Sequence, residues 1–302
     1  MTDTRVAVDG RELSLSNLDK VLYPDVGFTK GQVISYYQRI ASALLPHLDG
    51  RPLTLKRYPN GVDDKFFYEK RCPSHRPDWV TTAPILVGSK GEVPFCVVDS
   101  LPTLVWVANL ASLELHTSLS LADPIERPTM VVFDLDPGPG TDLVQCGQVA
   151  LWLRGVLEDH LGLTCFAKTS GSKGMQIYAP LNTPVTYEGG TKDFALAMAR
   201  LGERQLPDLV VSAMKKELRK DKVFIDWSQN DQHKTTVCVY SLRARPRPTV
   251  SMPVTWDEVE DMTAAGDATR LVFEADDAVA RVEEIGDLFA PMHTLVQELP
   301  KL

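Results

Sequence analysis

Two aspartates at the end of an apolar run have the spacing of a metal site. Asp134 and Asp136 come at the end of a run that begins at Met130, and Pro-Gly-Pro-Gly at 137–140 stops that run abruptly. Residues two apart in a strand project from the same face, with Cα atoms about 6.5–7 Å apart, so their carboxylates can converge. A divalent metal would relieve their repulsion, and hard oxygen ligands suit Mg²⁺ or Mn²⁺. The alternative is an ordinary strand-to-turn junction, where Asp is common.

Asp226 offers a third carboxylate. It lies near the end of the segment 222–227, which is predicted to be a strand with Phe224 and Asp226 on one face. Three carboxylates from two strand ends are what a two-metal phosphoryl-transfer site requires, with ions held about 3.5–4 Å apart. A lone Asp at a strand end is usually structural, so this interpretation depends on the pairing with Asp134 and Asp136.

A short loop of small residues, Thr-Ser-Gly-Ser-Lys-Gly at 169–174, separates two predicted strands. Small residues let the backbone approach a ligand closely, and successive N–H groups can bind an anion. Ser170 and Lys173 would add a hydroxyl and a cation for phosphates. The G-x-x-x-x-G-K-[ST] spacing of a P-loop is absent. A flexible hairpin loop is the alternative interpretation.

Cationic and aromatic side chains lie close together in the first quarter of the chain. Lys56 and Arg57 end a strand predicted within 51–58, and Phe66 and Phe67 stand among charged residues. Exposed aromatics beside Lys and Arg are suited to stacking on an unpaired base. Solvated cations and core phenylalanines are the alternatives.

Four further side chains are weak signals individually. Arg243 ends a later predicted strand, and Lys20 and Lys30 lie near predicted helix starts. His116 falls at the end of a predicted helix, where it is either a satisfied helix-end histidine or a phosphate contact.

The composition describes an ordinary globular protein without a membrane segment. Of 302 residues, 44% are hydrophobic and 24% charged, and 32 Lys and Arg against 40 Asp and Glu give a net charge of −8. That balance argues against indiscriminate polyanion binding but leaves room for a local basic groove. No stretch approaches the roughly 18 apolar residues that span a bilayer, and the N-terminus lacks a signal core, so we expect a cytoplasmic protein.

The five cysteines are scattered, and we expect them to be free. Cys96 and Cys165 fall in apolar strand-like runs, where cysteine behaves as a small hydrophobe. An odd number of scattered cysteines does not suggest a disulfide framework. Cys72 and His75 have half of a zinc-ligand spacing, but no second pair lies at a matching distance, so a structural zinc site is the minority interpretation.

The elements that must position these residues mix without a regular βαβ alternation. We therefore expect an α+β fold with a mainly antiparallel catalytic sheet flanked by helices. A hairpin is predicted at Arg5–Leu15 with its turn at Asp9-Gly10, then a brief helical turn within 16–24 and a helix started by the capping box Thr29-x-x-Gln32. Further strands are predicted at Ile85–Val87, Phe95–Val98, Met130–Asp134, Leu163–Lys168, Met175–Tyr178, Val223–Trp227 and Thr236–Leu242. Further helices are predicted at Leu104–Leu115, Thr141–Leu161, Lys192–Gln205, Leu209–Arg219, Thr255–Met262 and Asp276–Leu288.

Taken together, the motifs resemble the polymerase/primase domain of bacterial ligase D, a member of the archaeo-eukaryotic primase superfamily. Eight of them occur in that family's order: LSNLDKVLYP (15–24), KRYPNG (56–61), FFYEK (66–70), LELH (113–116), VFDLDPG (132–138), TSGSKG (169–174), DWSQN (226–230) and YSLRAR (240–245). The resemblance covers residues 13–253. It implies one primase-polymerase domain over 1–302, divisible into two lobes, with 254–302 as a C-terminal helical segment.

The resemblance also implies an activity and a set of roles. The activity is template-directed nucleotidyl transfer in end joining and gap repair, favouring ribonucleotides and Mn²⁺. Two metals would be held by Asp134, Asp136 and Asp226. The incoming triphosphate would be held by Lys56, His116, Ser170, Lys173, Gln229 and Arg243. The 5′-phosphate at a gap would be held by Asn17, Lys20 and Lys30, where localised donors suit a terminal phosphate. DNA and its template strand would contact Arg57, Phe66, Phe67 and Arg219.

Three departures from the family pattern bear on function. Gln176 stands where relatives of ligase D commonly have His, and an amide cannot carry positive charge. The stretch between His116 and Asp134 is short, and this would shrink a template-contacting loop. No Lys-x-Asp-Gly motif of an adenylating ligase occurs, so the product would pass to a separate ligase.

Two rival functions remain open. One is a metal-dependent phosphatase of the haloacid-dehalogenase type, which also begins with Asp-x-Asp but has Thr or Val where Gly138 stands. The other is a DNA-end-binding scaffold with a vestigial site, which the intact set of three carboxylates disfavours.

Overall fold

The computed structural model describes residues 3–88 and 91–301. The chain divides into two compact units, and each is described by itself. The first unit comprises the N-terminal segment to Ser118 together with Thr235–Ser251 and Phe273–Asp287. The second comprises Leu119–Lys234, Met252–Val272 and the segment from Leu288 onward.

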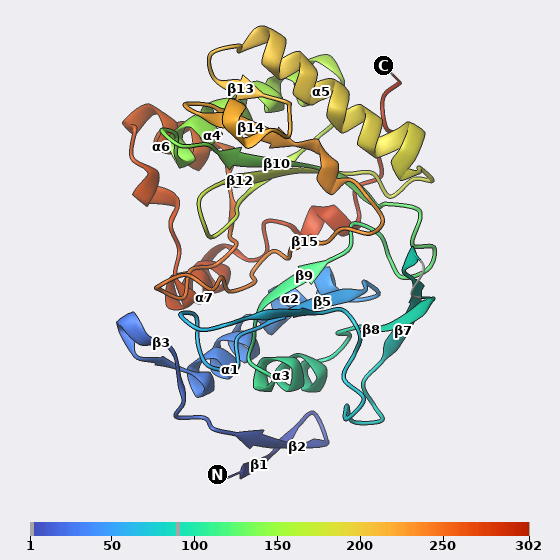
Figure 1. Cartoon of the computed structure of the whole chain (residues 1–302), viewed down its shortest axis with the longest axis vertical. Helices are drawn as coiled ribbons and strands as arrows, with labels where there is room; N and C mark the ends of the chain where they lie inside the picture. Colours follow the sequence, from blue (N-terminus) through green and yellow to red (C-terminus); the bar gives the residue numbers. More distant parts are fainter. Residues whose placement is uncertain (1–2, 89–90, 302) are drawn as a thin grey trace. The chain divides into compact units, whose positions relative to one another are not determined.

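The main sheet of the first unit has the strand order β15-β9-β5-β8-β7 (Figure 1). A sixth strand, β6, pairs with β5. Its strands are β5 (Leu53–Arg57), β6 (Phe67–Glu69), β7 (Thr82–Leu86), β8 (Glu92–Cys96), β9 (Ser112–Thr117) and β15 (Thr236–Val237). Its helices are α1 (Lys30–Arg39), α2 (Ala41–Leu48), α3 (Leu101–Asn109) and α7 (Ala275–Ile285). Residues 102–108 of α3 are all buried, so this helix supplies much of the core against α1 and the sheet.

Two local signals shape the N-terminal part of this unit as the sequence predicts. β1 (Asp3–Val8) and β2 (Arg11–Ser16) form a hairpin, and Asp9 and Gly10 both have positive φ, as a tight two-residue turn requires. The α1 capping box is present: Thr29 Oγ1 accepts from the Gln32 backbone N–H, and Gln32 Oε1 accepts from that of Thr29.

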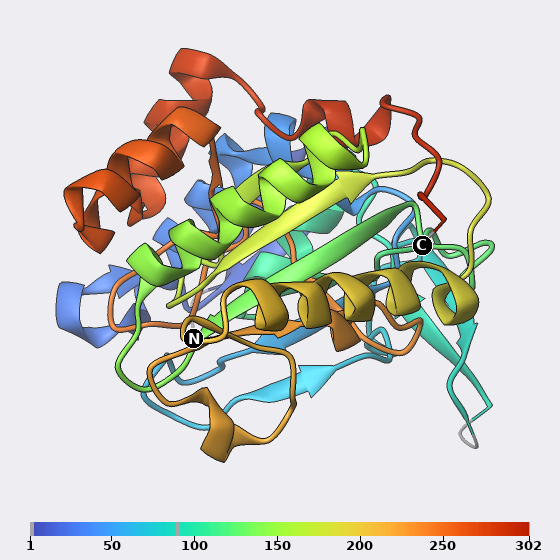
Figure 2. The same cartoon turned by 90° about the horizontal axis from the view of Figure 1, so that it is seen from above.

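The second unit has its own sheet, in the order β13-β14-β10-β12-β11-β16. Every neighbouring pair is antiparallel except β13 and β14. The strands are β10 (Met130–Pro137), β11 (Phe166–Thr169), β12 (Met175–Pro180), β13 (Val210–Val211), β14 (Val223–Asp226) and β16 (Pro253–Val254). α4 (Leu143–Gly155) and α5 (Lys192–Gln205) lie over one face of this sheet, and α6 (Trp256–Ala265) packs on α4 (Figure 2).

Among residues 3–88 and 91–301, the helices are all too short or too polar to cross a lipid bilayer.

Several sequence predictions of helix are wrong where the chain reverses. The helix predicted to reach Leu115 ends at Asn109; Ala111, at φ 57°, turns the chain into β9, so His116 lies on a strand. The segment 209–219 forms β13 and a short 3-10 turn at Lys216–Arg219. In the segment 16–24, β3 (Val21–Tyr23) replaces the helical turn and pairs with β4 (Phe28–Thr29). The strand predicted for Thr236–Leu242 is reduced to Thr236–Val237. In the three helix cases, strand pairing overrides local propensity.

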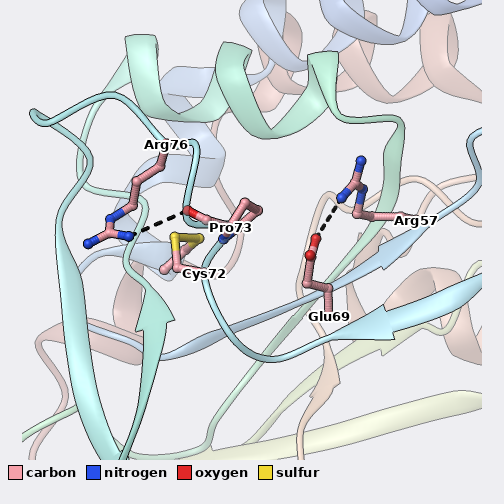
Figure 3. The surroundings of a disulfide bond; sticks show 6 residues. Arg57, Glu69, Cys72, Pro73 and Arg76 are labelled. Carbon is pink, nitrogen blue, oxygen red and sulfur yellow. Dashed lines mark hydrogen bonds and ion pairs between the residues drawn. A yellow bond between two sulfur atoms is a disulfide. The ribbon is translucent and has the colours of Figure 1, made fainter.

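The expectation of free cysteines is wrong for one pair. Cys72 and Cys96 form a disulfide, with Cα atoms 4.8 Å apart (Figure 3). The backbone N–H of Cys72 donates to Pro94 O at 2.7 Å, and this contact brings the segment after β6 alongside the end of β8. Because its sulfur is bonded, Cys72 is not a zinc ligand. Cys146, Cys165 and Cys238 are buried and take no part in a disulfide.

Candidate metal and nucleotide site

The three aspartates predicted to bind metal converge in the second unit. β10 lies between β12 and β14, and the register places Asp134 opposite Asp226 on one side and Gln176 on the other. Carboxylate oxygens of Asp134, Asp136 and Asp226 all lie within 4.8 Å of one another. Two strand ends therefore bring the carboxylates together as their spacing predicted.

Neutral side chains hold two of these carboxylates in place. Asp134 Oδ1 accepts from the Gln176 amide at 3.0 Å. Asp226 Oδ1 accepts from the Ser228 backbone N–H at 3.0 Å and hydroxyl at 2.5 Å, and Oδ2 accepts from the Gln229 amide at 2.8 Å. Gln229, predicted to contact the nucleotide, thus orients Asp226 in this structure. Gln176, the residue that departs from the family pattern, is fixed in turn because the Tyr178 hydroxyl donates to its Oε1 at 3.2 Å.

The electrostatics of this cluster suit a cation. Burial, and then the negative charges of Asp136 and Asp226, raise the pKa of Asp134 to about 7, against lowering by the Gln176 hydrogen bond and by Lys168. Like charges crowded in a site of low polarity favour either a proton or a metal ion. Three converging oxygen ligands fit Mg²⁺ or Mn²⁺, and the identity of the ion is not fixed by the ligands alone.

Two glycines permit the close backbone approach around the cluster. A Cβ at Gly174 would lie 2.2 Å from Leu135 O, and one at Gly138 would lie 1.7 Å from Arg219 O. The backbone N–H of Gly138 also donates to Lys222 O at 2.9 Å, joining the end of β10 to the start of β14. No side chain fits at either position, so both motifs need glycine there.

The loop 169–174 is folded on itself by Ser170. Its Oγ accepts from the backbone N–H groups of Ser172 at 3.2 Å and Gly174 at 3.1 Å, and Gly171 takes φ 66°. The Ser170 hydroxyl therefore shapes the loop, while Lys173 is exposed at its tip. Of the two predicted phosphate contacts, Lys173 is the one that this geometry presents to solvent.

The remaining predicted nucleotide contacts gather in the first unit, around a residue that the sequence analysis passed over. Glu114, on β9, is 2% exposed. Its carboxylate lies 3.1 Å from Lys56 Nζ, 2.9 Å from His116 Nε2 and 3.4 Å from Arg243 Nε. The signal that could have found it was the alternation of Leu113, Glu114, Leu115 and His116, which is typical of a strand with two polar side chains on one face.

The pKa of Glu114 shifts in the direction opposite to that of Asp134 in the metal cluster, which consists of Asp134, Asp136 and Asp226. Burial raises the pKa of Glu114, but the His116 hydrogen bond and the charges of Arg243, His116 and Lys56 outweigh it and hold that pKa well below its usual range. Burial, with the charges of Arg243 and Lys56, lowers the pKa of His116 despite Glu114. Glu114 is thus charged, and His116 tends toward its neutral form.

The aromatic side chains divide between the two faces of β6. Phe66 and Tyr68, 49% and 57% exposed, flank Lys56, whose Nζ lies 4.6 Å and 5.6 Å from their ring centroids. Phe67, 43% exposed, lies under the Arg57 guanidinium at 5.1 Å. Both phenylalanines are therefore exposed beside cations, as predicted, and they are not core residues.

A cavity of about 590 Å³ in the first unit collects the residues predicted to hold a 5′-phosphate. Asn17, Lys20 and Lys30 all line it, and Arg57, which was assigned to the template, lines it with them. Arg57 is oriented by Leu110 O at 2.9 Å and by Glu69 at 2.7 Å, the second contact shown in Figure 3.

Two of the cations that line this cavity, Lys20 and Lys30, donate hydrogen bonds to neutral oxygens. Lys20 Nζ donates to Asn60 Oδ1 at 2.8 Å, and Lys30 Nζ donates to Ser16 O at 2.7 Å. Burial, and then the charges of Lys20 and Arg57, lower the pKa of Lys30 to about 8. An entering anion would reverse part of this shift, so the cavity is suited to phosphate.

Arg219 lies near the metal cluster in the second unit. Its guanidinium lies 3.7 Å from the ring centroid of Phe224, which pairs with Asp136 across the sheet. Its predicted contact with DNA has no direct support in this geometry.

Comparisons with known proteins find one matching family model and several similar sequences. The family model described as "LigD, primase-polymerase domain" matches residues 29–289. The "Multifunctional non-homologous end joining protein LigD" of Mycolicibacterium smegmatis is 42% identical over 280 residues, 92% of this chain and 36% of that protein. The "Bifunctional non-homologous end joining protein LigD" of Bacillus subtilis is 31% identical over 290 residues, 96% of this chain and 45% of that protein.

A solved structure is also similar. The "Polymerase Domain from Mycobacterium tuberculosis Ligase D in complex with DNA" superposes with a TM-score of 0.86 at 40% identity, covering 95% of this chain and 99% of that one. It confirms the expected α+β fold with a mainly antiparallel sheet. The chain spans less than half the length of the curated relatives it matches.

Proposed function

This chain belongs to the LigD primase-polymerase family, and on that premise we propose that it is a template-directed nucleotidyltransferase that fills short gaps or processes ends in DNA repair. The observation that carries the proposal is the convergence of three carboxylates from β10 and β14 within 4.8 Å. The relatives named for non-homologous end joining set the repair context.

The carboxylates would hold two Mn²⁺ or Mg²⁺ ions. Such ions, when bound, stabilise both the attacking and the leaving oxygen of phosphoryl transfer. The chain's own part is to keep the ligands aimed: Gln176 orients Asp134, and Ser228 with Gln229 orients Asp226. Lys234 Nζ donates to the Ser228 hydroxyl at 2.5 Å and so fixes that hydroxyl in its turn.

The family resemblance assigns Lys56, His116 and Arg243 in the first unit to the incoming triphosphate. It assigns the same role to Ser170, Lys173 and Gln229 in the second unit. Glu114 supports this assignment, because one carboxylate gathers all three residues of the first set. A preference for ribonucleotides rests on the family resemblance.

The DNA partner is a gap, an overhang or a 5′-phosphorylated end. The cavity lined by Asn17, Lys20, Lys30 and Arg57 supplies localised donors for a terminal phosphate dianion. Phe66 and Phe67 offer exposed rings for an unpaired base. Because phosphate contacts release counterions, DNA binding should weaken as salt is raised.

The nick left after filling needs an adenylating ligase. No Lys-x-Asp-Gly motif occurs in these 302 residues, so ligation falls to an active site outside them. We place the activity in the cytoplasm, at the nucleoid, where broken chromosomal DNA is found.

Primer extension on short gaps tests the proposal. The purified protein is given a gapped duplex with a 5′-phosphate or a 5′-hydroxyl, Mn²⁺ or Mg²⁺, and ribo- or deoxyribonucleotides. We expect templated extension that requires metal and is favoured by the 5′-phosphate. Release of phosphate from a small phosphate ester, without nucleotide incorporation, would instead support the phosphatase alternative.

A further inference from the structure

Glu114 is the most completely engaged buried acid of the first unit. Oε1 accepts from Lys56 Nζ at 3.1 Å and from the Ala244 backbone N–H at 3.1 Å, and the Tyr58 hydroxyl lies 3.5 Å away. Oε2 lies 2.9 Å from His116 Nε2 and 3.4 Å from Arg243 Nε. Removing a carboxylate from water is costly unless its oxygens are satisfied, and here donors from three chain segments satisfy them.

These donors come from segments far apart in the sequence. Lys56 lies on β5, His116 on β9 beside Glu114, and Arg243 beyond β15. Glu114 contacts the side chain of Arg243, and its hydrogen bond from the Ala244 N–H also fixes the backbone next to Arg243. One carboxylate thus sets the positions of three side chains that no shared element would otherwise align.

We propose that Glu114 is a positioning residue for the incoming nucleotide, holding Lys56, His116 and Arg243 in the arrangement that receives it. This inference rests on the proposed function, since those three residues are assigned to the triphosphate there. Glu114 itself touches no substrate in this scheme.

Glu114 also decides which nitrogen of His116 carries a proton. An ionised carboxylate only accepts hydrogen bonds, so Nε2 must donate to it. Lys56, Arg243 and the ring of Tyr68, 6.0 Å from the imidazole, are the other groups that face His116. The imidazole cannot turn over without breaking its bond to Glu114.

A competing role predicts the opposite effect on binding. If Glu114 only offset positive charge, its neutralisation would strengthen attraction of a triphosphate and lower the KM for nucleotide. If it positions the cations, neutralisation lets them disperse, and the KM rises. The sign of the change therefore separates the two roles.

The test uses the full chain on a 5′-phosphorylated gap with Mn²⁺. We expect E114Q to raise the KM for nucleoside triphosphate by at least about tenfold with a smaller change in kcat, as when an orienting carboxylate behind a ligand-holding group is lost. E114D keeps the charge but shortens the side chain, so its KM should lie between those of E114Q and the parent. The matched control is Glu274→Gln, an ion-paired glutamate of the same unit whose partner is Arg247; its KM should stay at the parental value.

A second readout does not need polymerase activity. The His116 imidazole is followed by NMR in the full chain, assigned among the six histidines with H116A. In E114Q its pKa should fall further, because the hydrogen bond and charge that raise it are removed, and in the Glu274→Gln control it should not move.

The outcomes separate this inference from the proposed function. A parental protein that incorporates no nucleotide overturns the proposed function, while a shift of the His116 pKa in E114Q would still show that Glu114 controls that side chain. An active parent whose KM is unchanged or lowered in E114Q overturns the positioning role. Thermal unfolding of E114Q and E114D shows that either comparison is made on folded protein.

Discussion

Each unit of this protein holds a carboxylate with a shifted pKa, and the two carboxylates have opposite electrostatic surroundings. In the second unit, Asp134 lies beside Asp136 and Asp226, and its pKa is raised to about 7. In the first unit, Glu114 lies among Lys56, His116 and Arg243, and its pKa is held well below the usual range. Neutral groups donate the hydrogen bonds that Asp134 and Asp226 accept, whereas two cations, Lys56 and Arg243, lie within 3.4 Å of the Glu114 carboxylate.

This difference indicates which acid is suited to a ligand. The aspartate cluster carries an excess of negative charge that a divalent cation would neutralise, as the proposed function requires. Glu114 is already neutralised by the protein, so its charge organises its neighbours and remains unavailable for metal. The charges around a carboxylate thus indicate whether it is suited to bind a metal ion or to position its neighbours, even where the two look alike in sequence.

Of the changes that test this comparison, substitution in the aspartate cluster should have the largest effect, and that effect is on catalysis. Asp134→Ala or Asp136→Ala should abolish primer extension, a loss of about 4 kcal/mol or a thousandfold, because the metal-held transition state is lost. Binding to gapped DNA, measured by anisotropy, should persist. Extension that survives both changes would contradict the two-metal assignment.

The next effect is on stability and should have opposite signs in the two units. Glu114→Ala should lower the free energy of unfolding by about 3–5 kcal/mol, because it leaves buried cations without their partner. Asp136→Asn in metal-free protein should leave it unchanged or raise it by about 1 kcal/mol, because it relieves repulsion. Denaturant titration of both variants measures this contrast, and equal destabilisation by the two would refute it.

The third effect is a pH dependence that originates in the metal cluster. A carboxyl whose folded pKa is raised contributes stability below its unfolded pKa of 3.8, and that contribution is lost as pH rises through about 7. Metal-free protein should therefore lose about 1 kcal/mol between pH 6 and pH 8. The lowered pKa of Glu114 works the other way: its contribution is present above the unfolded value and is lost only in acid.

Thermal unfolding at pH 6 and pH 8, with and without Mn²⁺, measures this dependence. Mn²⁺ must displace the proton on Asp134, so its stabilisation should be larger at pH 8. Asp134→Asn should remove the dependence between the two pH values. A stabilisation by Mn²⁺ that is equal at both would mean that Asp134 is already ionised at pH 6.

The smallest effect concerns the phosphate cavity, where cations lie together as the aspartates do in the metal cluster. Lys20→Ala should reduce the preference for a 5′-phosphorylated gap over a hydroxylated one severalfold, about 1 kcal/mol, because Lys20 is exposed and one of several donors. Competition binding with the two DNAs measures it. Arg270→Ala, paired with Asp267 in the other unit, is the control; an identical preference in Lys20→Ala and the parent would remove Lys20 from the pocket.

The sequence predicted the metal cluster better than the cation cluster, for a physical reason. Asp134 and Asp136 belong to one strand, and strand alternation alone puts them on one face. The role proposed for Glu114 depends on its contacts with Lys56 and Arg243, which are far from it in sequence. It was also hidden because the apolar residues around it were assigned to a helix that in fact ends at Asn109.

Capping boxes and turns were the local features that sequence predicted accurately. Thr29 and Gln32 start α1 as expected, and the Asp9-Gly10 turn closes the first hairpin. The disulfide was missed because Cys72 reaches Cys96 through a backbone contact with Pro94, which is a tertiary event. Strand or helix at Val210 was likewise decided by pairing with Val223.

The alternation along β5 and β6 sets what kinds of sequence change this unit can tolerate. Lys56 pairs with Tyr68 and faces Glu114, whereas Arg57 pairs with Phe67 and lines the phosphate cavity. Substituting either residue would alter one site and leave the other in place. Deleting one residue from β5 would move every following side chain to the opposite face, so it would exchange the chemistry of the two sites. Natural variants of this unit should therefore differ by replacement in β5 and accommodate insertions and deletions elsewhere.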